Sequence, residues 1–318
     1  MLNRRILRIK VFKEVYSYAE NNSLTLKEAL SEFDASCEAV RDLYLFMMSF
    51  AVPLAREAAS RIEAAGRKFY KSEEDLHPNT RFATNAFSAL LAEDAEFNKF
   101  ITRKKLSWDQ YDVLIRNVYD SVSSKDWFKA YMEAPESSLK DDCRLFYRIF
   151  EEEFVENAEL EKILEDLDIY WNDDLAYALT WCCTSCKEIA RTGRWTLPPL
   201  YQSEVSARKG KAVDSDRDFA VKLLQCAYAG YGKYYQMVSD SVSKFDKDRL
   251  FTTDVVLCAV GLAEAENFSE IPVKVTINEY VEISKFYSTP KSRAFVNGIL
   301  DRLIRKLSDE GKIVKKND

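Results

Sequence analysis

The sequence predicts an all-α protein, and three observations support this prediction. The 318 residues include only 8 glycines and 7 prolines, too few for the many tight turns of an all-β protein. Residues that favour helices, above all Leu, Ala, Glu, Lys and Arg, are abundant. Apolar positions recur at helical spacing, and several such stretches begin with helix-capping residues. The chain is long enough for a large core or for two domains.

Composition also restricts the class of protein. Hydrophobic residues make up 47% of the chain, and 46 basic against 52 acidic residues give a net charge of −6. No apolar run reaches the roughly 18 residues that a membrane-spanning helix needs, so we expect no membrane association. The charged N-terminus is not followed by an apolar stretch, so we expect no signal peptide and a cytoplasmic protein.

The first predicted helix covers residues 3–19, and its apolar positions lie on nearly all sides, so neighbouring helices should enclose it. Thr25 and Glu28 form a capping box that starts a second helix. A long helix is expected from 36 towards 67, bent at Pro53, where a backbone donor is lost.

Further helices follow these first elements along the chain. A capping box at Ser107 predicts another helix start. Two more helices are expected at 138–166 and 173–191, and the glycines and prolines of 192–210 indicate a loop. The last predicted helices are one that begins near 219 and reaches about 242, one that ends near 266, and two that lie between 271 and the C-terminus.

The N-terminal helix is strongly basic. Five positive side chains precede the first acid, Glu14: Arg4, Arg5, Arg8, Lys10 and Lys13. A basic tip on an acidic protein indicates an electrostatic binding site. Arg4 and Arg8 lie four residues apart on one helical face, and arginine matches phosphate oxygens in pairs. The alternative is a solvated helix with ordinary surface arginines.

The C-terminal segment 271–303, IPVKVTINEYVEISKFYSTPKSRAFVNGILDRL, resembles the end of the bacterial antitermination factor family NusB. The matching residues are Pro272, Val275, Ile277, Asn278, Glu279, Val281, Glu282, Lys285, Phe295, Val296, Asn297, Gly298, Ile299, Leu300 and Asp301. The pattern that runs from Arg4 to Tyr16 and the FDKDR link at 245–249 also resemble this family. Lys291 departs from it, since an acid is common there.

The resemblance implies a protein without catalysis or cofactor that binds RNA and a protein partner. It implies recognition of boxA-type single-stranded RNA in ribosomal RNA leaders, together with NusE, a small-subunit ribosomal protein, within an RNA polymerase antitermination complex. The expected RNA-binding residues are Arg4, Arg5, Arg8, Lys10, Tyr16, Lys291, Ser292, Arg293, Phe295 and Asn297.

The start of the final helix supports this expectation. Ser288 or Thr289 should cap it, with Pro290 at the first helical position. Phe295 lies one step off the apolar stripe, among basic residues, as in proteins that stack RNA bases on aromatic rings. The alternative is that Phe295 packs against the first helix.

The resemblance covers about 33 residues at the front of the chain and about 100 at the back. We therefore predict a NusB-like double helical bundle from 1–33 and 215–318, with an inserted helical subdomain at 34–214. Within the insert, residues 136–174 hold 14 acids and 4 bases. This acidic stretch should repel RNA or attract a basic protein, unless it is only a solvated helix face.

Three alternatives stay open. Cys183 and Cys186 form a C-x-x-C inside a helical pattern, which fits buried core cysteines better than a redox pair or a metal site, since His77 is the only histidine. An RNA-modifying enzyme with a NusB-like domain would need a following glycine-rich cofactor domain. A protein-only scaffold that has lost RNA binding is the third alternative.

Overall fold

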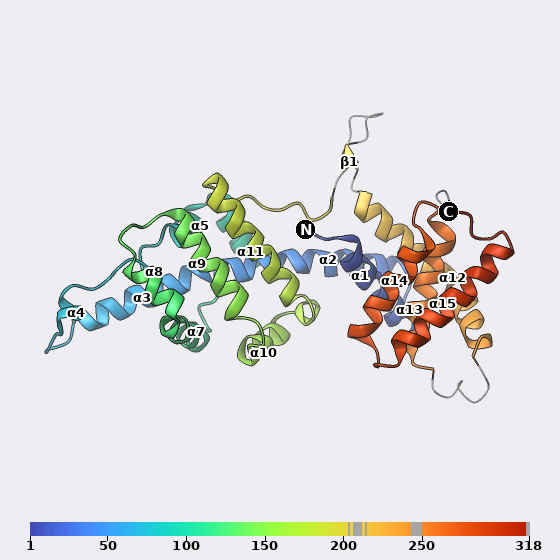
Figure 1. The fold of residues 1–318 in the computed structure, drawn as a ribbon, viewed down its shortest axis with the longest axis horizontal. Helices are drawn as coiled ribbons and strands as arrows, with labels where there is room; N and C mark the ends of the chain where they lie inside the picture. Colours follow the sequence, from blue (N-terminus) through green and yellow to red (C-terminus); the bar gives the residue numbers. More distant parts are fainter. Residues whose placement is uncertain (203, 206–211, 214, 243–249, 316–318) are drawn as a thin grey trace. The chain divides into compact units, whose positions relative to one another are not determined.

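The computed structural model describes residues 1–202, 204–205, 212–213, 215–242 and 250–315 (Figure 1). The chain forms two compact units. Unit 1 combines Met1–Cys37 with Pro199–Asp318, and unit 2 is Glu38–Pro198. The domain boundaries predicted from the sequence, after residues 33 and 214, differ from those of the two units by 4 and 16 residues. Independent folding of the inserted segment stays a prediction.

Unit 1 is built around α13 (Thr252–Asn267). Every residue of α13 from Asp254 to Ala265 is buried, because the helix is apolar on all sides and contacts helices all round it. Its neighbours are α1 (Arg4–Glu20), α12 (Ser215–Asp240), α14 (Val273–Tyr287) and α15 (Ser292–Asp309). The predicted enclosure of the first helix is confirmed, since α1 contacts both α12 and α13 and buries Leu7, Val11 and Val15.

The predicted capping box at the start of α2 (Leu26–Ser49) is present. The Glu28 carboxylate accepts the Thr25 backbone N–H at 2.8 Å, and the Glu28 N–H donates to the Thr25 hydroxyl at 3.3 Å. These two bonds satisfy backbone donors that the first helical turn would leave without a partner. The capping residues therefore fix where this helix begins.

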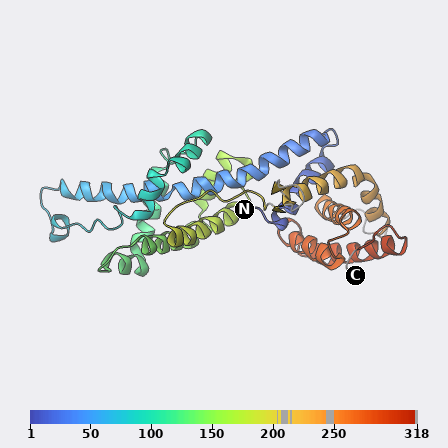
Figure 2. The same ribbon diagram turned by 90° about the horizontal axis from the view of Figure 1, so that it is seen from above.

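The predicted long helix with a bend at Pro53 is wrong in its bounds. The chain forms α2 and α3 (Ala51–Gly66), which are separated at Phe50. Figure 2 shows α3 continuing almost in line with the end of α2. Pro53 lies in the first turn of α3, where no helical partner is needed for a backbone N–H. The helix therefore breaks before the proline and not at it.

Unit 2 contains the end of α2, then α3, and a series of shorter helices. These are α4 (Glu73–Leu76), α5 (Ala86–Glu93), α6 (Ala95–Lys104), α7 (Asp112–Ser124), α8 (Asp126–Glu133), α9 (Leu139–Glu152), α10 (Ala158–Leu167), a 3-10 turn (Ile169–Trp171) and α11 (Leu175–Thr192). Aromatic rings fill its core, and Phe46 stacks on Trp108 with ring centroids 3.8 Å apart.

Two predicted helix bounds in unit 2 need correction. The capping box at Ser107 does not start a helix, because the Trp108 indole is buried and donates to the Phe46 carbonyl at 3.0 Å. Residues 108–111 therefore form a turn before α7. The predicted helix at 138–166 is two helices, since Glu156 adopts a left-handed backbone with φ of 57° and Asn157 caps α10.

The segment predicted as a loop at 192–210 includes part of a small hairpin. Glu204–Val205 (β1) pairs antiparallel with Ala212–Val213 (β2). In the rest of the described chain, the ordered elements are helices, so the all-α prediction is confirmed. None of the described helices combines the length and apolarity that crossing a membrane requires.

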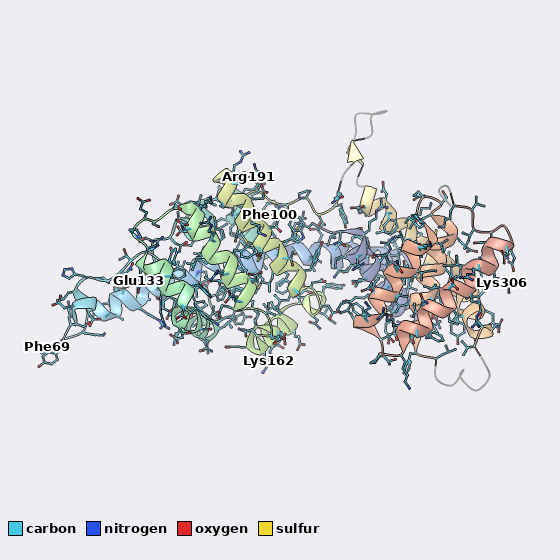
Figure 3. All side chains as sticks on the ribbon, viewed as in Figure 1. Phe69, Phe100, Glu133, Lys162, Arg191 and Lys306 are labelled. Atoms are coloured by element: carbon cyan, nitrogen blue, oxygen red, sulfur yellow. The ribbon has the colours of Figure 1, made fainter. Side chains whose placement is uncertain are left out.

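The connection between α3 and α4 carries two exposed aromatic rings. Phe69 and Tyr70 are 91% and 86% exposed and contact each other edge to face at 4.9 Å. Phe69 points away from the helices of unit 2 in Figure 3. Lys68 and Asp75 form an ion pair at 3.0 Å across this connection.

Candidate nucleic-acid interface

The basic helix α1 has a well-defined start. The Asn3 side chain accepts the backbone N–H groups of Arg5 and Ile6, each at 3.0 Å. The Leu2 N–H donates to the Leu200 carbonyl at 2.7 Å, which holds the preceding residues against a distant part of unit 1. Because an N-cap side chain satisfies the free donors of the first turn, the arginine side chains leave the helix from a fixed backbone.

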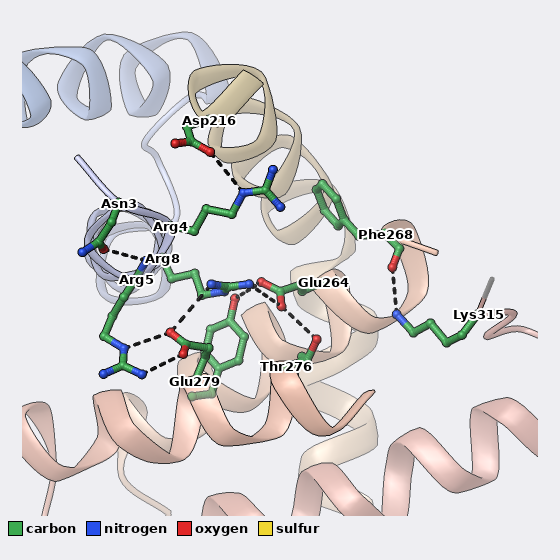
Figure 4. Close-up of polar contacts among 11 residues, drawn as sticks. Asn3, Arg4, Arg5, Arg8, Asp216, Glu264, Phe268, Thr276, Glu279 and Lys315 are labelled. Carbon is green, nitrogen blue, oxygen red and sulfur yellow. Dashed lines mark hydrogen bonds and ion pairs between the residues drawn. The ribbon is translucent and has the colours of Figure 1, made fainter. Parts of the chain in front are cut away.

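Arg4 and Arg5 are exposed, but each has a carboxylate partner (Figure 4). Arg4 Nε lies 3.1 Å from Asp216 Oδ1 on α12. Arg5 donates twice to Glu279 on α14, at 2.9 and 2.7 Å. The Arg5 hydrogen bonds hold the pKa of Glu279 below its ordinary value, so this carboxylate stays charged. The pairing lowers the positive potential that the sequence predicted for this tip.

Arg8 lies in the core, which departs from its predicted RNA contact. Its side chain is 4% exposed and donates to both oxygens of Glu264, at 2.7 and 3.0 Å. Thr276 and Tyr280 of α14 also donate to Glu264, at 2.8 and 3.2 Å. Burial opposes the charge on Arg8, but the bond and charge of Glu264 raise its pKa above the ordinary value. Lys10 is buried as well, at 1% exposure.

A second polar cluster joins the ends of three helices. Asp254, near the start of α13, accepts the hydroxyls of Ser288 and Ser292 at 2.6 and 2.7 Å. Ser288 follows α14, and Ser292 opens α15. Ser292 is 1% exposed, so its side chain lies inside unit 1, where it positions these helix ends, and not on the surface where the RNA contact was predicted.

The predicted cap of α15 is also corrected. The helix begins at Ser292 with Lys291 as N-cap, and no side chain caps it. The hydroxyl of Ser288 bonds Asp254, and that of Thr289 lies 2.9 Å from the Ser292 hydroxyl. Pro290 therefore precedes the helix, because both capping candidates belong to the cluster at Asp254.

The remaining predicted residues of α15 lie at the surface. Lys291, Arg293 and Asn297 are exposed, and Phe295 is half-buried. Among the residues that the structure describes, neither Lys291 nor Arg293 has a carboxylate within ion-pair distance. Their charges are therefore less compensated than those of Arg4 and Arg5.

Two aromatic residues near this cluster escaped the sequence prediction. Phe286 is 80% exposed at the end of α14, and Phe251 is 53% exposed before α13. Lys285 is also exposed, although it pairs with Glu282. We define the helix-end surface as Phe251, Lys285, Phe286, Lys291, Arg293, Phe295 and Asn297. In the sequence, the consecutive residues Lys285, Phe286 and Tyr287 near a predicted helix end could have indicated this surface.

The structure brings the second half of α1 close to the end of α14. The Lys13 ammonium lies 5.5 Å from the centre of the Tyr287 ring, and Phe12 contacts both Tyr287 and Tyr16. Arg5 instead pairs with Glu279, which is eight residues, or about 12 Å of helix, before Tyr287. Lys13 and the half-buried Tyr16 are therefore the α1 residues next to the helix-end surface.

Comparison with known proteins identifies this bundle. The NusB family model matches residues 199–305. The chain is 33% identical over 101 residues to the transcription antitermination protein NusB of Salinibacter ruber, which covers 32% of this chain and 63% of that protein. It is 33% identical over 135 residues to NusB of Dictyoglomus turgidum, covering 40% of this chain and 91% of the relative. The chain belongs to the NusB family.

The NusB match begins at Pro199, the residue at which the second segment of unit 1 begins. A third relative, NusB of Dictyoglomus thermophilum, is 32% identical over 127 residues, which span 37% of this chain and 85% of that protein. No solved structure matches the chain. The FDKDR link that also resembles NusB lies at 245–249, outside the described residues.

The cysteines of unit 2 fit the interpretation as core residues. Cys186 is buried, and burial raises its pKa well above the ordinary value. Cys183 is half-buried, with its pKa raised to about 11, chiefly by burial. A reactive or metal-binding thiol needs the thiolate, which these surroundings disfavour. In the described part of the chain, no group of His, Cys, Asp and Glu side chains is arranged to hold a metal ion.

Proposed function

We propose that this NusB-family chain is an RNA-binding transcription antitermination factor. Its RNA would be a boxA-type single strand of ribosomal RNA leaders, its protein partner NusE, and its setting the RNA polymerase antitermination complex. The relatives carry the name transcription antitermination protein. The observation that carries the RNA proposal is the helix-end surface, where exposed cations and aromatic rings lie together.

The helix-end surface has the chemistry that single-stranded RNA requires. Lys291 and Arg293 supply positive charge without a carboxylate partner in the described residues, so they can attract phosphates. Phe286 and the half-buried Phe295 expose ring surface for base stacking, which tolerates different bases. Asn297 adds an exposed amide that can donate to and accept from a base edge.

The predicted α1 residues take different parts in this proposal. Arg4 and Arg5 sit at the surface and can exchange a carboxylate for a phosphate, at the cost of their present ion pairs. Arg8 and Lys10 support the fold from inside unit 1. Tyr16 lies near the end of α14, through Phe12 and Tyr287, next to the helix-end surface.

The test is a binding titration with a boxA-type RNA oligonucleotide and a scrambled one, followed by fluorescence anisotropy. The double variant Lys291→Glu, Arg293→Glu should lower boxA affinity about tenfold or more. It should also flatten the log–log salt slope by about 0.7 for each lost phosphate contact. Equal affinity of the double variant and the unmodified protein at low salt would contradict the proposal.

A charge-matched control separates this surface from general electrostatics. Lys274 is exposed near the start of α14, and Arg305 is exposed near the end of α15. Along the helix axis, Lys274 lies about 16 Å from Lys285, and Arg305 lies about 18 Å from Arg293. The variant Lys274→Glu, Arg305→Glu removes one lysine and one arginine as well. It should retain boxA affinity within about threefold, because electrostatic contacts at this distance are screened in salt.

The pairing of the α1 arginines favours one alternative, a NusB-like scaffold without RNA binding. That protein would capture NusE in a pull-down and bind boxA and scrambled RNA equally weakly. An RNA-binding factor should instead prefer boxA over the scrambled sequence, and NusE should strengthen that preference. Performing the titration with and without NusE therefore separates the two functions.

A further inference from the structure

Unit 2 contains a groove between α9 and α11. It has a volume of about 600 Å³, within the range typical of ligand sites. Cys143 from α9 and Cys186 and Ala190 from α11 contribute apolar surface, and the half-buried Tyr147 lines it as well. Both helices belong to the same compact unit, so the groove is a property of unit 2 alone.

The groove is strongly basic. Lys140, Arg144 and Arg148 follow one another at four-residue spacing along α9, and Lys187 faces them from α11. All four side chains are exposed. Glu151 is the acid among the lining residues, and it accepts a hydrogen bond from the Tyr147 hydroxyl at 3.2 Å. The lining therefore carries four positive charges against one negative charge.

This basic groove lies in the most acidic part of the sequence. Residues 136–174 hold 14 acids and 4 bases, and three of those bases line the groove. Some of the acids face elsewhere. Asp142, for example, is buried and accepts the Tyr131 hydroxyl and the Ala86 N–H, each at 2.7 Å. Arg144 does pair with Asp141 at 3.2 Å, but the two side chains are 67% and 42% exposed, so solvent weakens the pair.

We propose that the groove between α9 and α11 binds the phosphate backbone of single-stranded RNA, as a second RNA contact of this protein. This inference rests on the proposed RNA-binding function and assigns part of it to the inserted segment. Arginine forks and lysines are the side chains that hold phosphates. The Tyr147 ring lies beside these cations, 4.7 Å from the Lys187 ammonium, and can stack a base when Lys187 turns to a phosphate.

The arrangement of the cations favours a strand over a compact anion. From Lys140 to Arg148 the row extends over eight residues, or about 12 Å of helix. A free nucleotide concentrates its phosphates at one point and would need cations that converge there. A polynucleotide spaces its charges along a line, as this row does. The fork geometry of two arginines and an aromatic ring beside them favours RNA over an acidic peptide.

The test compares two double variants of the full chain. Lys140→Glu, Lys187→Glu changes the lining from four positive and one negative charge to two positive and three negative. Lys99→Glu, Lys162→Glu makes the same change of charge at exposed lysines of α6 and α10, outside the groove. Lys162 is labelled on α10 in Figure 3. Far-UV circular dichroism and thermal melting check that both variants fold.

Each protein is titrated with a short boxA-type RNA and with a longer RNA that extends it by about 20 nucleotides. The groove variant should bind the longer RNA about tenfold more weakly, with a salt slope smaller by about 1.4 for two lost phosphate contacts. The control variant should stay within about twofold of the unmodified protein. Equal losses in the two variants, or none in the groove variant, overturn the inference.

The same titrations separate the two proposals. If the short RNA binds and the longer one binds no more tightly, the groove inference fails while the proposed function stands. If the short RNA does not bind but the longer one does, with loss in the groove variant, the boxA proposal fails and the groove stands. Competition by ATP or by polyglutamate as strong as by the longer RNA would overturn the assignment to an RNA strand.

Discussion

Helices α1 and α9 carry nearly the same pattern of cations and use it in opposite ways. Arg4 and Arg8 are four residues apart on α1, in the most basic stretch of the chain, yet one is paired with a carboxylate and the other is buried. Lys140, Arg144 and Arg148 repeat the same spacing on α9, in the most acidic stretch, yet they all face solvent along one groove. Local sequence charge therefore does not give the charge of the surface.

The difference comes from where the compensating acids lie. The partners of the α1 arginines are Asp216, Glu264 and Glu279, which lie 212, 256 and 274 residues further along the chain. The acids of α9 are local. Asp141 pairs with Arg144 and Glu151 lines the groove, whereas Asp142 and Glu152 accept hydrogen bonds from other parts of unit 2. Long-range pairing therefore compensates the charges of α1, whereas the row on α9 keeps a net positive charge.

The strongest test of this comparison is Arg8→Met. Removing one partner of a buried ion pair leaves Glu264 charged and uncompensated, so unit 1 should lose about 3–5 kcal/mol of unfolding free energy. A surface arginine would cost less than about 0.5 kcal/mol. Urea unfolding followed by far-UV circular dichroism measures the loss. All five tryptophans lie in residues 38–198, so tryptophan emission reports on unit 2 in the same samples.

The matched control is the double variant Arg8→Met, Glu264→Gln. Glutamine keeps an acceptor for Thr276 and Tyr280 but removes the unpaired charge, so part of the lost stability should return. A single variant as stable as the unmodified protein would place Arg8 at the surface after all. Arg8 could then take part in phosphate binding as the sequence predicted.

Glu14, on the same helix, gives the next largest effect. Burial first, and then the charge of Glu32, raise its pKa to about 7 from a usual value of 4.5. Because the folded pKa is the higher one, ionisation in the folded state costs stability as the pH rises through about 4.5 to 7. Glu14→Gln should remove this cost, which is about 3 kcal/mol at most above pH 7.

The measurement for Glu14→Gln is the free energy of unfolding at pH 5 and pH 8. The gain should be large at pH 8 and small at pH 5, where the buried carboxyl is already mostly protonated. Glu20→Gln, at an exposed position of α1, should show no such difference. An equal gain at both pH values would mean that the substitution acts through packing and not through the charge.

Phe295→Ala tests the helix-end surface, which we propose as an RNA contact. Base stacking on an aromatic ring is worth about 1–3 kcal/mol, so boxA affinity should fall about 5- to 150-fold. Because Phe295 is half-buried, some stability should also be lost, but less than the roughly 3–5 kcal/mol of a core phenylalanine. A large stability loss with unchanged affinity per folded molecule would assign Phe295 to the core.

Phe286→Ala is the companion variant. This ring is 80% exposed, so its removal should leave stability unchanged within about 0.5 kcal/mol. If the helix-end surface binds RNA, affinity should still fall, and the two variants together rank the rings as stacking platforms. Unchanged affinity for Phe286→Ala would exclude this ring from the contact.

The sequence predicted the helical class, the enclosed α1 and the cap at Thr25, because these depend on local composition, periodicity and hydrogen bonds within a few residues. It missed the helix break at Phe50 and the start of α15 at Ser292. The start of α15 depends on tertiary contacts. Ser288, for example, would be a good cap, but Asp254 from a different helix takes its hydroxyl.

The candidate site was predictable only in part, for the same reason. Lys291 and Arg293 were predicted from their place beside Phe295 at the start of the last helix, and Asn297 through the resemblance; all three are exposed. Arg8 was chosen for its helical face, and no local pattern indicates that Glu264 would lie against it in the core. The net charge of residues 136–174 did not predict the basic groove of unit 2. A sum over a stretch of sequence does not record on which face each charge lies.

The smallest expected effect is also the most direct test of pairing as the cause of the difference between α1 and α9. Arg5 and Glu279 form an ion pair whose partners are 49% and 18% exposed, so its loss should cost at most about 1 kcal/mol of stability. Glu279→Gln frees the Arg5 charge for phosphate. BoxA affinity at low salt should therefore rise about two- to fivefold, and the salt slope should steepen by up to about 0.7.

Arg5→Gln should change affinity less than the Lys291→Glu, Arg293→Glu variant does. If Glu279→Gln left both affinity and slope unchanged, compensation by Glu279 would not limit the contribution of Arg5 to RNA binding, and the contrast with α9 would need another cause.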